Sequence, residues 1–195
     1  VGSADYTNSS IQGQVNVAVQ QRQPGSSIKP ILYAAAFTRG MSPATLVWDV
    51  STDFVTSNGA IYSPRNYDSK FHGPVRLRQA LANSFNMPAV KVLDQVGIPA
   101  MLDMAHRLGV EGLDKSPENY GLALTLGGSE VTLLSMTGAF AVFANGGARM
   151  APTPILQITD ASGRNLLEKA QAEQVIDPRV AYQLASVLSD NEARK

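Results

Sequence analysis

The sequence has no cysteine and only two histidines. The lack of cysteine excludes disulfides, thiolate nucleophiles and thiolate metal ligands, and it suits an oxidising extracytoplasmic space. His72 and His106 lie far apart and no other pattern of metal ligands accompanies them, so we expect surface or packing roles for both. We therefore expect no metal and no cofactor. Any chemistry must use other side chains as nucleophile and base.

An excess of charge of one sign and a long hydrophobic run are also absent. Sixteen basic residues balance sixteen acidic ones, which argues against a nucleic-acid partner. The longest apolar run, residues 133–144, is well short of the ~20 residues that span a bilayer, so it predicts a core helix. The chain opens at Val1 without an initiator methionine or a signal peptide. We expect it to be cut from a longer protein, with any membrane anchor outside this sequence.

What is present is the composition of a globular domain. The chain has 195 residues, 44% of them hydrophobic, which fits one domain or most of one. Periodicity, proline and glycine predict helices over 26–40, 75–83, 87–96, 99–108, 132–144 and 178–188.

Few segments predict strands. Residues 14–19 alternate polar and apolar side chains and predict a half-buried strand or an extended segment, and residues 155–160 and 164–168 predict a hairpin. Residues 41–74 show no sustained period and predict a long irregular surface segment. Gly127 and Gly128 are predicted to provide tight backbone geometry before the helix that follows them.

The stretch QPGSSIKP, residues 23–30, offers a nucleophile and a base. Ser26 and Lys29 are three residues apart at a predicted helix start, so one turn brings both side chains to the same face, and we expect them to lie within hydrogen-bonding reach of each other. A partly desolvated lysine at the positive end of a helix has a lowered pKa, and its neutral amine can then act as general base for a serine hydroxyl. Nearby backbone amides can stabilise an oxyanion. The same spacing is also typical of a helix cap beside a solvated lysine.

Two further stretches match a serine-x-asparagine motif. In penicillin-binding proteins and class A β-lactamases, such a motif and a lysine-threonine-glycine strand accompany the serine-lysine spacing. Residues 84–86 (Ser84, Phe85, Asn86) follow a short predicted helix at a bend where side chains can converge on a site. Residues 189–191 lie at the end of the last predicted helix and are interpreted as a helix-terminal cluster. We therefore prefer residues 84–86.

A more specific resemblance covers nearly the whole chain. It is carried by RQPGSSIKPILYAAAF, YSPRNYDSKFHGPVRLRQALANSFNMPAV and LGGSEVTLLSMTGAFAVFANGG. In order and spacing these segments resemble consecutive blocks of the transpeptidase domain of bifunctional class A penicillin-binding proteins. The resemblance implies an α+β fold of the serine transpeptidase and β-lactamase type, of which this chain supplies mainly the helical part with a few strands.

The resemblance also implies a reaction. Ser26 would be acylated by the penultimate D-alanine carbonyl of a peptidoglycan stem peptide, and the acyl group would pass to an amine on a neighbouring strand. Lys29 would be the base, Ser84 would relay its proton to the leaving amine, and Asn86 would bind the substrate amide and orient Lys29. Stem peptides and β-lactam antibiotics would be the partners. The parent protein would be extracytoplasmic, membrane-anchored and equipped with an upstream glycosyltransferase.

One element of the family pattern is missing. No lysine is followed by threonine or serine and then glycine: Lys115 precedes Ser116 and Pro117, and Lys195 ends the chain. In the family this motif lies on a strand that supplies an oxyanion amide and recognises the substrate carboxylate. We therefore interpret residues 1–195 as a partial transpeptidase domain, weak or inactive alone. An incomplete sheet edge would favour association with the missing C-terminal piece or another chain.

Two other functions remain open at this stage. A D,D-carboxypeptidase or β-lactamase shares the acylation step but releases the acyl group to water. No glutamate is followed four residues later by asparagine, the arrangement that class A β-lactamases use to position that water, so transfer is favoured over hydrolysis. A non-catalytic sensor or scaffold domain with a penicillin-binding fold is the third interpretation.

Overall fold

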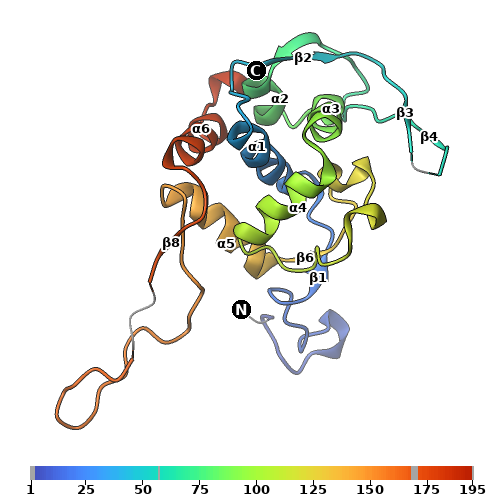
Figure 1. Ribbon diagram of the computed structural model, residues 1–195. Helices are drawn as coiled ribbons and strands as arrows, with labels where there is room; N and C mark the ends of the chain where they lie inside the picture. The colour runs from blue at the N-terminus through green and yellow to red at the C-terminus, as the bar shows by residue number, and fades with distance from the viewer. Residues whose placement is uncertain (1–2, 57, 168–170, 195) are drawn as a thin grey trace.

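The fold is built around one buried helix. The computed structural model describes residues 3–56, 58–167 and 171–194. Helix α1 (Lys29–Thr38) continues directly from the 3₁₀ turn η2 (Gly25–Ile28), so the helix predicted from residue 26 begins as a 3₁₀ turn. All residues from 29 to 37 are buried. Helices surround α1 on several sides (Figure 1), which explains why its sequence is apolar almost all round.

The other predicted helices are present. They are α2 (Leu77–Ala82), α3 (Asn86–Val96), α4 (Ile98–Arg107), α5 (Leu133–Ala144) and α6 (Pro178–Leu188). Short 3₁₀ turns are η1 (Ser9–Ile11), η3 (Pro117–Asn119), η4 (Leu122–Leu126) and η5 (Glu192–Arg194). Local caps start two of the helices: the Thr132 side chain accepts from Ser135 N, and Asp177 accepts from Arg179 N.

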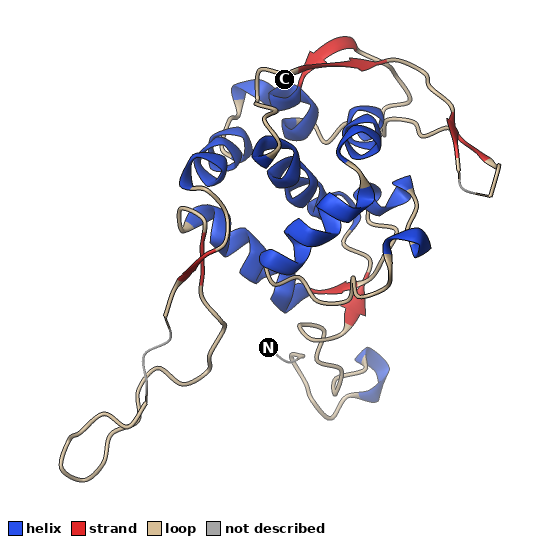
Figure 2. Cartoon of the chain, viewed as in Figure 1, coloured by secondary structure: helices blue, strands red, loops and turns tan. Residues whose placement is uncertain are grey.

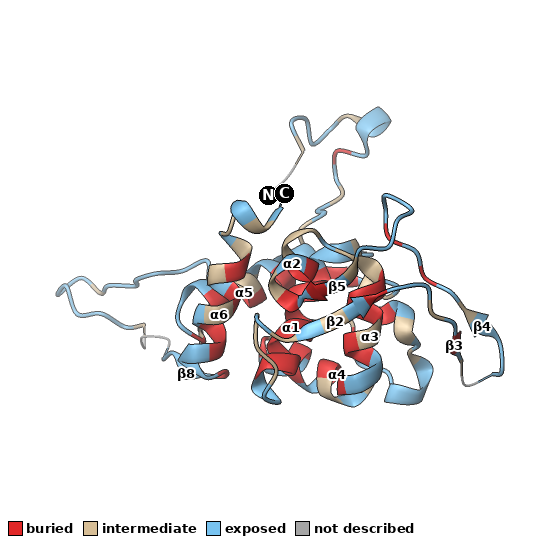
Figure 3. Cartoon of the chain, turned by 90° about the horizontal axis from the view of Figure 1, so that it is seen from above, coloured by how far each residue is buried: buried red, intermediate tan, exposed pale blue. Residues whose placement is uncertain are grey.

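The hydrophobic core lies between these helices. Helices α2, α3, α4 and α6 all contact α1, and α5 packs on α6. The helices form the body of the molecule and the strands lie at its periphery (Figure 2). Buried residues gather in the helical body, whereas the projecting segments are mostly exposed (Figure 3). The site described below is therefore held by helix packing.

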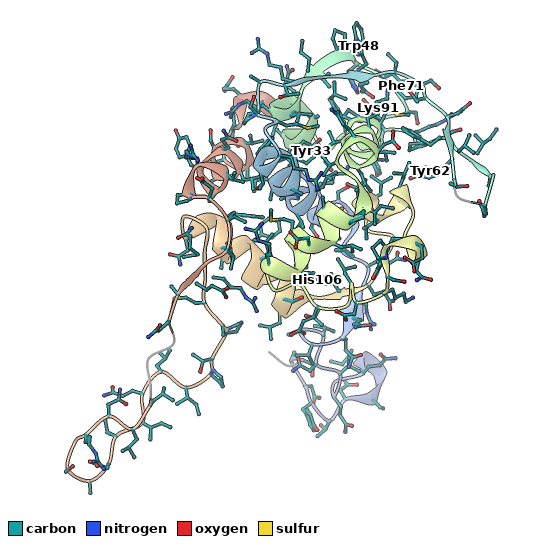
Figure 4. All side chains as sticks on the ribbon, in the orientation of Figure 1. Tyr33, Trp48, Tyr62, Phe71, Lys91 and His106 are labelled. Carbon is teal, nitrogen blue, oxygen red and sulfur yellow. The ribbon has the colours of Figure 1, made fainter. Side chains whose placement is uncertain are left out.

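The described strands form four two-stranded antiparallel ribbons. They pair β1 (Gln21–Arg22) with β6 (Val131–Thr132), β2 (Leu46–Asp49) with β5 (Gly73–Arg76), β3 (Phe54–Val55) with β4 (Ile61–Tyr62), and β7 (Ala148–Arg149) with β8 (Glu173–Gln174). The β2–β5 ribbon packs on α3, where Lys91 Nζ donates to Trp48 O at 2.7 Å (Figure 4).

The strand predicted over residues 14–19 is wrong. These residues form turns, and the strand β1 begins only at residue 21. The side chain of Asn16 accepts a hydrogen bond from Ala18 N, a turn-forming contact that competes with strand pairing. Val17 and Val19 are each about half exposed, so the alternating pattern buries no face.

The segment 41–74 is also more ordered than predicted, because it contains β2, β3, β4 and the start of β5. The predicted hairpin is present only in part: an isolated bridge pairs Thr159 with Asn165, Leu166 N donates to Ile158 O and Asp160 N to Arg164 O, but neither described arm forms a strand. Position 168, the end of the predicted second strand, lies outside the described residues. The hairpin projects away from the helical body (Figure 1).

Helix α5, predicted as a core helix, is only partly buried. Ala139 and Val142 face the core, whereas Leu133 and Leu134 are 57% and 46% exposed. Among the described residues, the helices are all too short or too polar to cross a bilayer.

Candidate active site

The Lys29 amine is the centre of the candidate site. Lys29 opens α1 and is 1% exposed. Its Nζ donates to Ser84 O at 2.7 Å, to Ser84 Oγ at 3.2 Å and to Asn86 Oδ1 at 2.7 Å. The acceptors come from the bend between α2 and α3. The structure therefore brings together three of the four residues predicted from the sequence.

Burial sets the electrostatics of this amine. Desolvation lowers the pKa of Lys29 from 10.5 to about 8, because the charged form loses its hydration in the interior. At neutral pH a much larger fraction of the amine is then neutral than for a lysine in water. A buried amine of this kind can accept a proton from a hydroxyl.

Ser26 lies one turn before Lys29, at the exposed end of the site. It is the second residue of η2, and its carbonyl accepts from Lys29 N. Within the described residues the Ser26 hydroxyl forms no hydrogen bond, so the expected bond between the side chains of Ser26 and Lys29 is not made here. Side chains three residues apart eclipse one another in a 3₁₀ turn, which keeps both on the same side. The Ser27 hydroxyl, in contrast, donates to Pro24 O at 2.7 Å.

Ser84 faces Lys29 because its backbone is left-handed. Its φ is +57°, an uncommon value for a serine. Ser84 N donates to Leu81 O and Phe85 N donates to Ala80 O, which closes the end of α2. This turn directs both the carbonyl and the hydroxyl of Ser84 toward the amine. Backbone strain of this kind persists only where surrounding contacts hold it.

Two glycines fix the position of the turn that carries Ser26. Gly127, with φ +85°, ends η4, and a Cβ there would lie 2.3 Å from Gly25 N. Because no side chain fits between them, the two backbones are in direct contact. The prediction that Gly127 provides tight backbone geometry is confirmed, and the contact lies directly before Ser26.

Analysis of the sequence missed Asn66. Its Oδ1 accepts hydrogen bonds from the backbone amides of Asn86 and Met87, at the start of α3. Asn66 lies 20 residues before Asn86 in a segment without helix or strand. Local cap patterns could not have identified it, because a cap residue is normally adjacent to the helix that it caps.

The second serine-x-asparagine stretch has no part in the site. Ser189 Oγ donates to Ala185 O, and Asp190 forms a salt bridge with Arg78 at 2.8 Å. The first contact closes the last turn of α6 and the second ties its end to α2, as expected for a helix-terminal cluster. The two histidines also lie outside the contacts of Lys29: His106 Nε2 is 3.0 Å from Leu113 O, and His72 belongs to the network around Asn66.

The chain is similar in sequence to known proteins. Residues 1–195 match the model of the penicillin binding protein transpeptidase domain. The chain is 35% identical over 199 residues to penicillin-binding protein 1A of Neisseria meningitidis, covering 97% of the chain and 24% of that protein. It is 39% identical over 203 residues to penicillin-binding protein 1A of Aquifex aeolicus, covering 100% of the chain and 27% of that protein. The chain thus spans about a quarter of these relatives.

The fold of the chain is similar to that of a solved penicillin-binding protein. The crystal structure of penicillin-binding protein 1A from Haemophilus influenzae superposes with a TM-score of 0.81 at 28% identity, over 91% of this chain and 31% of that one. The predicted α+β fold of the serine transpeptidase and β-lactamase type is confirmed, with this chain mainly helical. The chain belongs to the family of penicillin-binding protein transpeptidase domains.

Proposed function

We propose that this chain carries the acylation site of a peptidoglycan D,D-transpeptidase, in which Ser26 forms the acyl-enzyme and is the target of β-lactam antibiotics. The observation that carries the proposal is the buried Lys29 amine in contact with Ser84 Oγ and Asn86 Oδ1. Its lowered pKa suits a general base, and the chain has no thiol that could act as nucleophile instead.

In the first half of the proposed reaction, Ser26 Oγ attacks the carbonyl carbon of the penultimate D-alanine of a stem peptide. The hydroxyl proton passes to Lys29 Nζ. As the tetrahedral intermediate collapses, the C–N bond breaks and a proton reaches the leaving amine of the terminal D-alanine through Ser84 Oγ. The 3.2 Å contact between Lys29 Nζ and Ser84 Oγ supports this relay. The product is an ester on Ser26.

In the second half, an amine of a neighbouring stem peptide attacks the ester carbonyl. The amine loses a proton through Ser84 and Lys29, the ester C–O bond breaks, and Ser26 Oγ recovers its proton. Asn86 serves to bind the substrate amide, since its side-chain nitrogen donates to Arg65 O and has a second N–H that makes no other bond to the part of the chain that the structure describes. A β-lactam follows the first half only: its ring C–N bond breaks, its nitrogen takes the proton, and a long-lived ester remains.

The proposal includes a longer protein around this chain. The chain spans about a quarter of its relatives, and no lysine-threonine-glycine sequence occurs in it. We place residues 1–195 in a transpeptidase domain that is completed by a strand with that sequence, in an extracytoplasmic, membrane-anchored protein. The missing strand supplies an oxyanion amide and the group that recognises the substrate carboxylate.

The test is the position of the penicillin adduct. The complete gene product is incubated with penicillin, digested and analysed by mass spectrometry, with Ser26→Ala as the matched control. We expect a single adduct on Ser26 in the wild-type protein and none in the variant. An adduct on Ser27 or Ser84, or no adduct, contradicts the site assignment.

A second assay separates transfer from hydrolysis. A synthetic stem peptide is supplied with an amine acceptor, and the products are separated by chromatography. We expect a cross-linked product whose yield rises with the concentration of acceptor. Release of D-alanine without cross-linking assigns a carboxypeptidase instead, and no turnover despite penicillin binding assigns a sensor.

A further inference from the structure

A network of buried polar groups lies behind the motif formed by Ser84, Phe85 and Asn86. Its central residue, Asn66, is 4% exposed. Asn66 Oδ1 accepts from Asn86 N at 2.7 Å and from Met87 N at 3.1 Å. The N-cap residue of α3, Phe85, offers no side-chain acceptor. The first backbone N–H groups of a helix have no acceptor within the helix. Asn66 accepts from two of these groups in α3, although it lies 20 residues before the start of that helix.

The other end of the Asn66 side chain is equally fixed. Its Nδ2 donates to Asp49 Oδ1 at 3.0 Å, to Asp49 Oδ2 at 2.8 Å and to Lys70 O at 2.8 Å. Two backbone donors meet the oxygen of the amide and acceptors meet its nitrogen, so only one orientation satisfies every partner. Asp49 ends β2, and its side chain is fully buried. Asn66 is thus locked between a buried carboxylate and the start of α3.

The same carboxylate also holds His72. The backbone N of His72 donates to Asp49 Oδ2 at 3.0 Å, and its Nδ1 lies 2.6 Å from the same oxygen. The ring of His72 stacks on Phe85, with centroids 4.1 Å apart and an interplanar angle of 12°. Phe85 is the middle residue of the motif. Asp49 therefore reaches the motif by two routes, through Asn66 to the backbone of Asn86 and through His72 to the ring of Phe85.

A third contact comes from the neighbour of Asn66. Asn86 Nδ2 donates to Arg65 O at 2.8 Å, while Asn86 Oδ1 accepts from Lys29 Nζ. Residues 65 and 66 thus hold both the side chain and the backbone of Asn86. The segment 63–72 has neither helix nor strand, so side-chain and turn contacts fix its position. The placement of Asn86 relative to the amine depends on this segment.

We propose that Asn66, anchored by Asp49, is a positioning residue that sets Ser84 and Asn86 at their distances from Lys29. This inference rests on the proposed function of the same site. Asn66 touches none of the reacting groups and acts through Asn86. Its effect is on the rate of the acylation step, because general-base and relay geometry tolerate little displacement.

The substitution Asn66→Asp tests this role with little change in shape. It keeps an acceptor toward Asn86 N and Met87 N but replaces the Nδ2 donors by an oxygen that faces the carboxylate of Asp49. Like charges at this separation repel strongly in a buried site. Asp49→Asn in the same protein removes the like charge and restores a donor across the pair, whereas Lys70 O still faces an oxygen of residue 66. We expect acylation to be about 10- to 100-fold slower in N66D and to recover in part in the double variant.

The experiment measures acylation of the complete gene product by a fluorescent penicillin. Both the rate constant and the fraction of molecules finally labelled are recorded. A merely structural defect lowers the labelled fraction, whereas a positioning defect lowers the rate constant at full labelling. Asn119→Asp, an exposed change of the same kind, is the control and keeps the wild-type rate. A wild-type rate in N66D, or a loss confined to the labelled fraction, overturns the proposal.

A second measurement does not depend on acylation. The titration of Lys29 is followed by NMR in Asn66→Ala, which adds no charge, and in the control, because the new carboxylate of N66D would raise the pKa of Lys29 without any displacement of the motif. Displacement of the motif admits water to the amine, so the midpoint rises toward the value of an exposed lysine. An unchanged or lowered titration midpoint of Lys29 overturns the positioning role. This result can be read even if penicillin does not acylate the wild-type protein. Absence of acylation would instead contradict the proposed function. If N66D does not fold, the acylation rate of Asn66→Ala is measured in its place.

Discussion

The buried lysine makes the stability of this protein depend on pH, and the sign is opposite to that of a surface lysine in an ion pair. The pKa of Lys29 is lowered from 10.5 to about 8 in the folded chain. Between these two values the unfolded chain binds more protons than the folded one, so the free energy of unfolding rises with pH. Below about 8 both states are protonated, and the full cost of burying the charge is present.

The magnitude follows from the same two values. Each pKa difference of 1 corresponds to about 1.4 kcal/mol, so the cost of burying the charged amine is about 3 kcal/mol. Of this, about 2 kcal/mol is recovered between about pH 7 and about pH 9.5. The upper limit of this pH interval is set by Tyr33. Burial raises the pKa of its hydroxyl, so at higher pH the hydroxyl ionises in the unfolded chain first, and this lowers the free energy of unfolding.

The assay is chemical denaturation of the wild-type chain and of Lys29→Met at both pH values. The methionine leaves Ser84 O and Asn86 Oδ1 without their donor, but this cost does not change with pH. Groups that titrate in both proteins cancel. We expect the wild type to gain about 2 kcal/mol relative to the variant as the pH rises. If the free energy of unfolding depends on pH equally in the two proteins, or if the wild type loses stability relative to the variant as the pH rises, the lowered pKa of the buried Lys29 is refuted.

Two further predictions use matched pairs of positions. Gly127→Ala should lower the free energy of unfolding by about 1–3 kcal/mol, since its Cβ meets Gly25 and its φ is left-handed, and acylation should slow as well. Gly121→Ala, where no atom lies within 4 Å of the new Cβ, should stay within about 0.5 kcal/mol of wild type; equal effects at both positions would disprove the backbone contact. Ser84→Ala should slow acylation by a fluorescent penicillin about 100-fold or more through loss of the relay, whereas Ser189→Ala should have no effect. The reverse result would show that the wrong motif was chosen.

The helices could be predicted because their signals are local. Pro178 follows the cap residue Asp177 at the start of α6, and Gly40 follows the end of α1. The strands could not be predicted as well, since three of the four described ribbons pair segments that lie far apart: β1 pairs with β6 across more than a hundred residues, and only β3 and β4 are close neighbours along the chain. Alternation alone predicted a strand or extended segment over 14–19, and no described strand pairs with these residues.

Part of the candidate site could also be predicted from the sequence, and part of it could not. The short spacing between Ser26 and Lys29 and the family resemblance together identified the residues around the amine. The resemblance, however, does not specify which group holds Asn86 in place. Asn66 and Asp49 contribute through contacts across 20 and 17 residues, and no periodic or cap pattern marks such contacts. The hydroxyl of Ser26, expected to lie within reach of the amine, is exposed and forms no hydrogen bond within the described residues, where the Lys29 amine donates to Ser84 and Asn86 instead.

The burial of α1 along nearly its whole length restricts how this protein can evolve. The helix begins with the proposed general base and continues through Ala34, Ala35 and Ala36, and only its last residue, Thr38, is exposed, so the other positions offer no surface site at which a substitution costs little. Larger side chains at the alanines would push neighbouring helices apart, and smaller ones elsewhere would leave cavities. Heritable changes that alter ligand recognition while preserving the fold should therefore accumulate in the exposed segments around the amine. The exposed positions of residues 63–72, which exclude the buried Pro64 and Asn66, form one such segment, so sequence variation there should change the response of this protein to inhibitors.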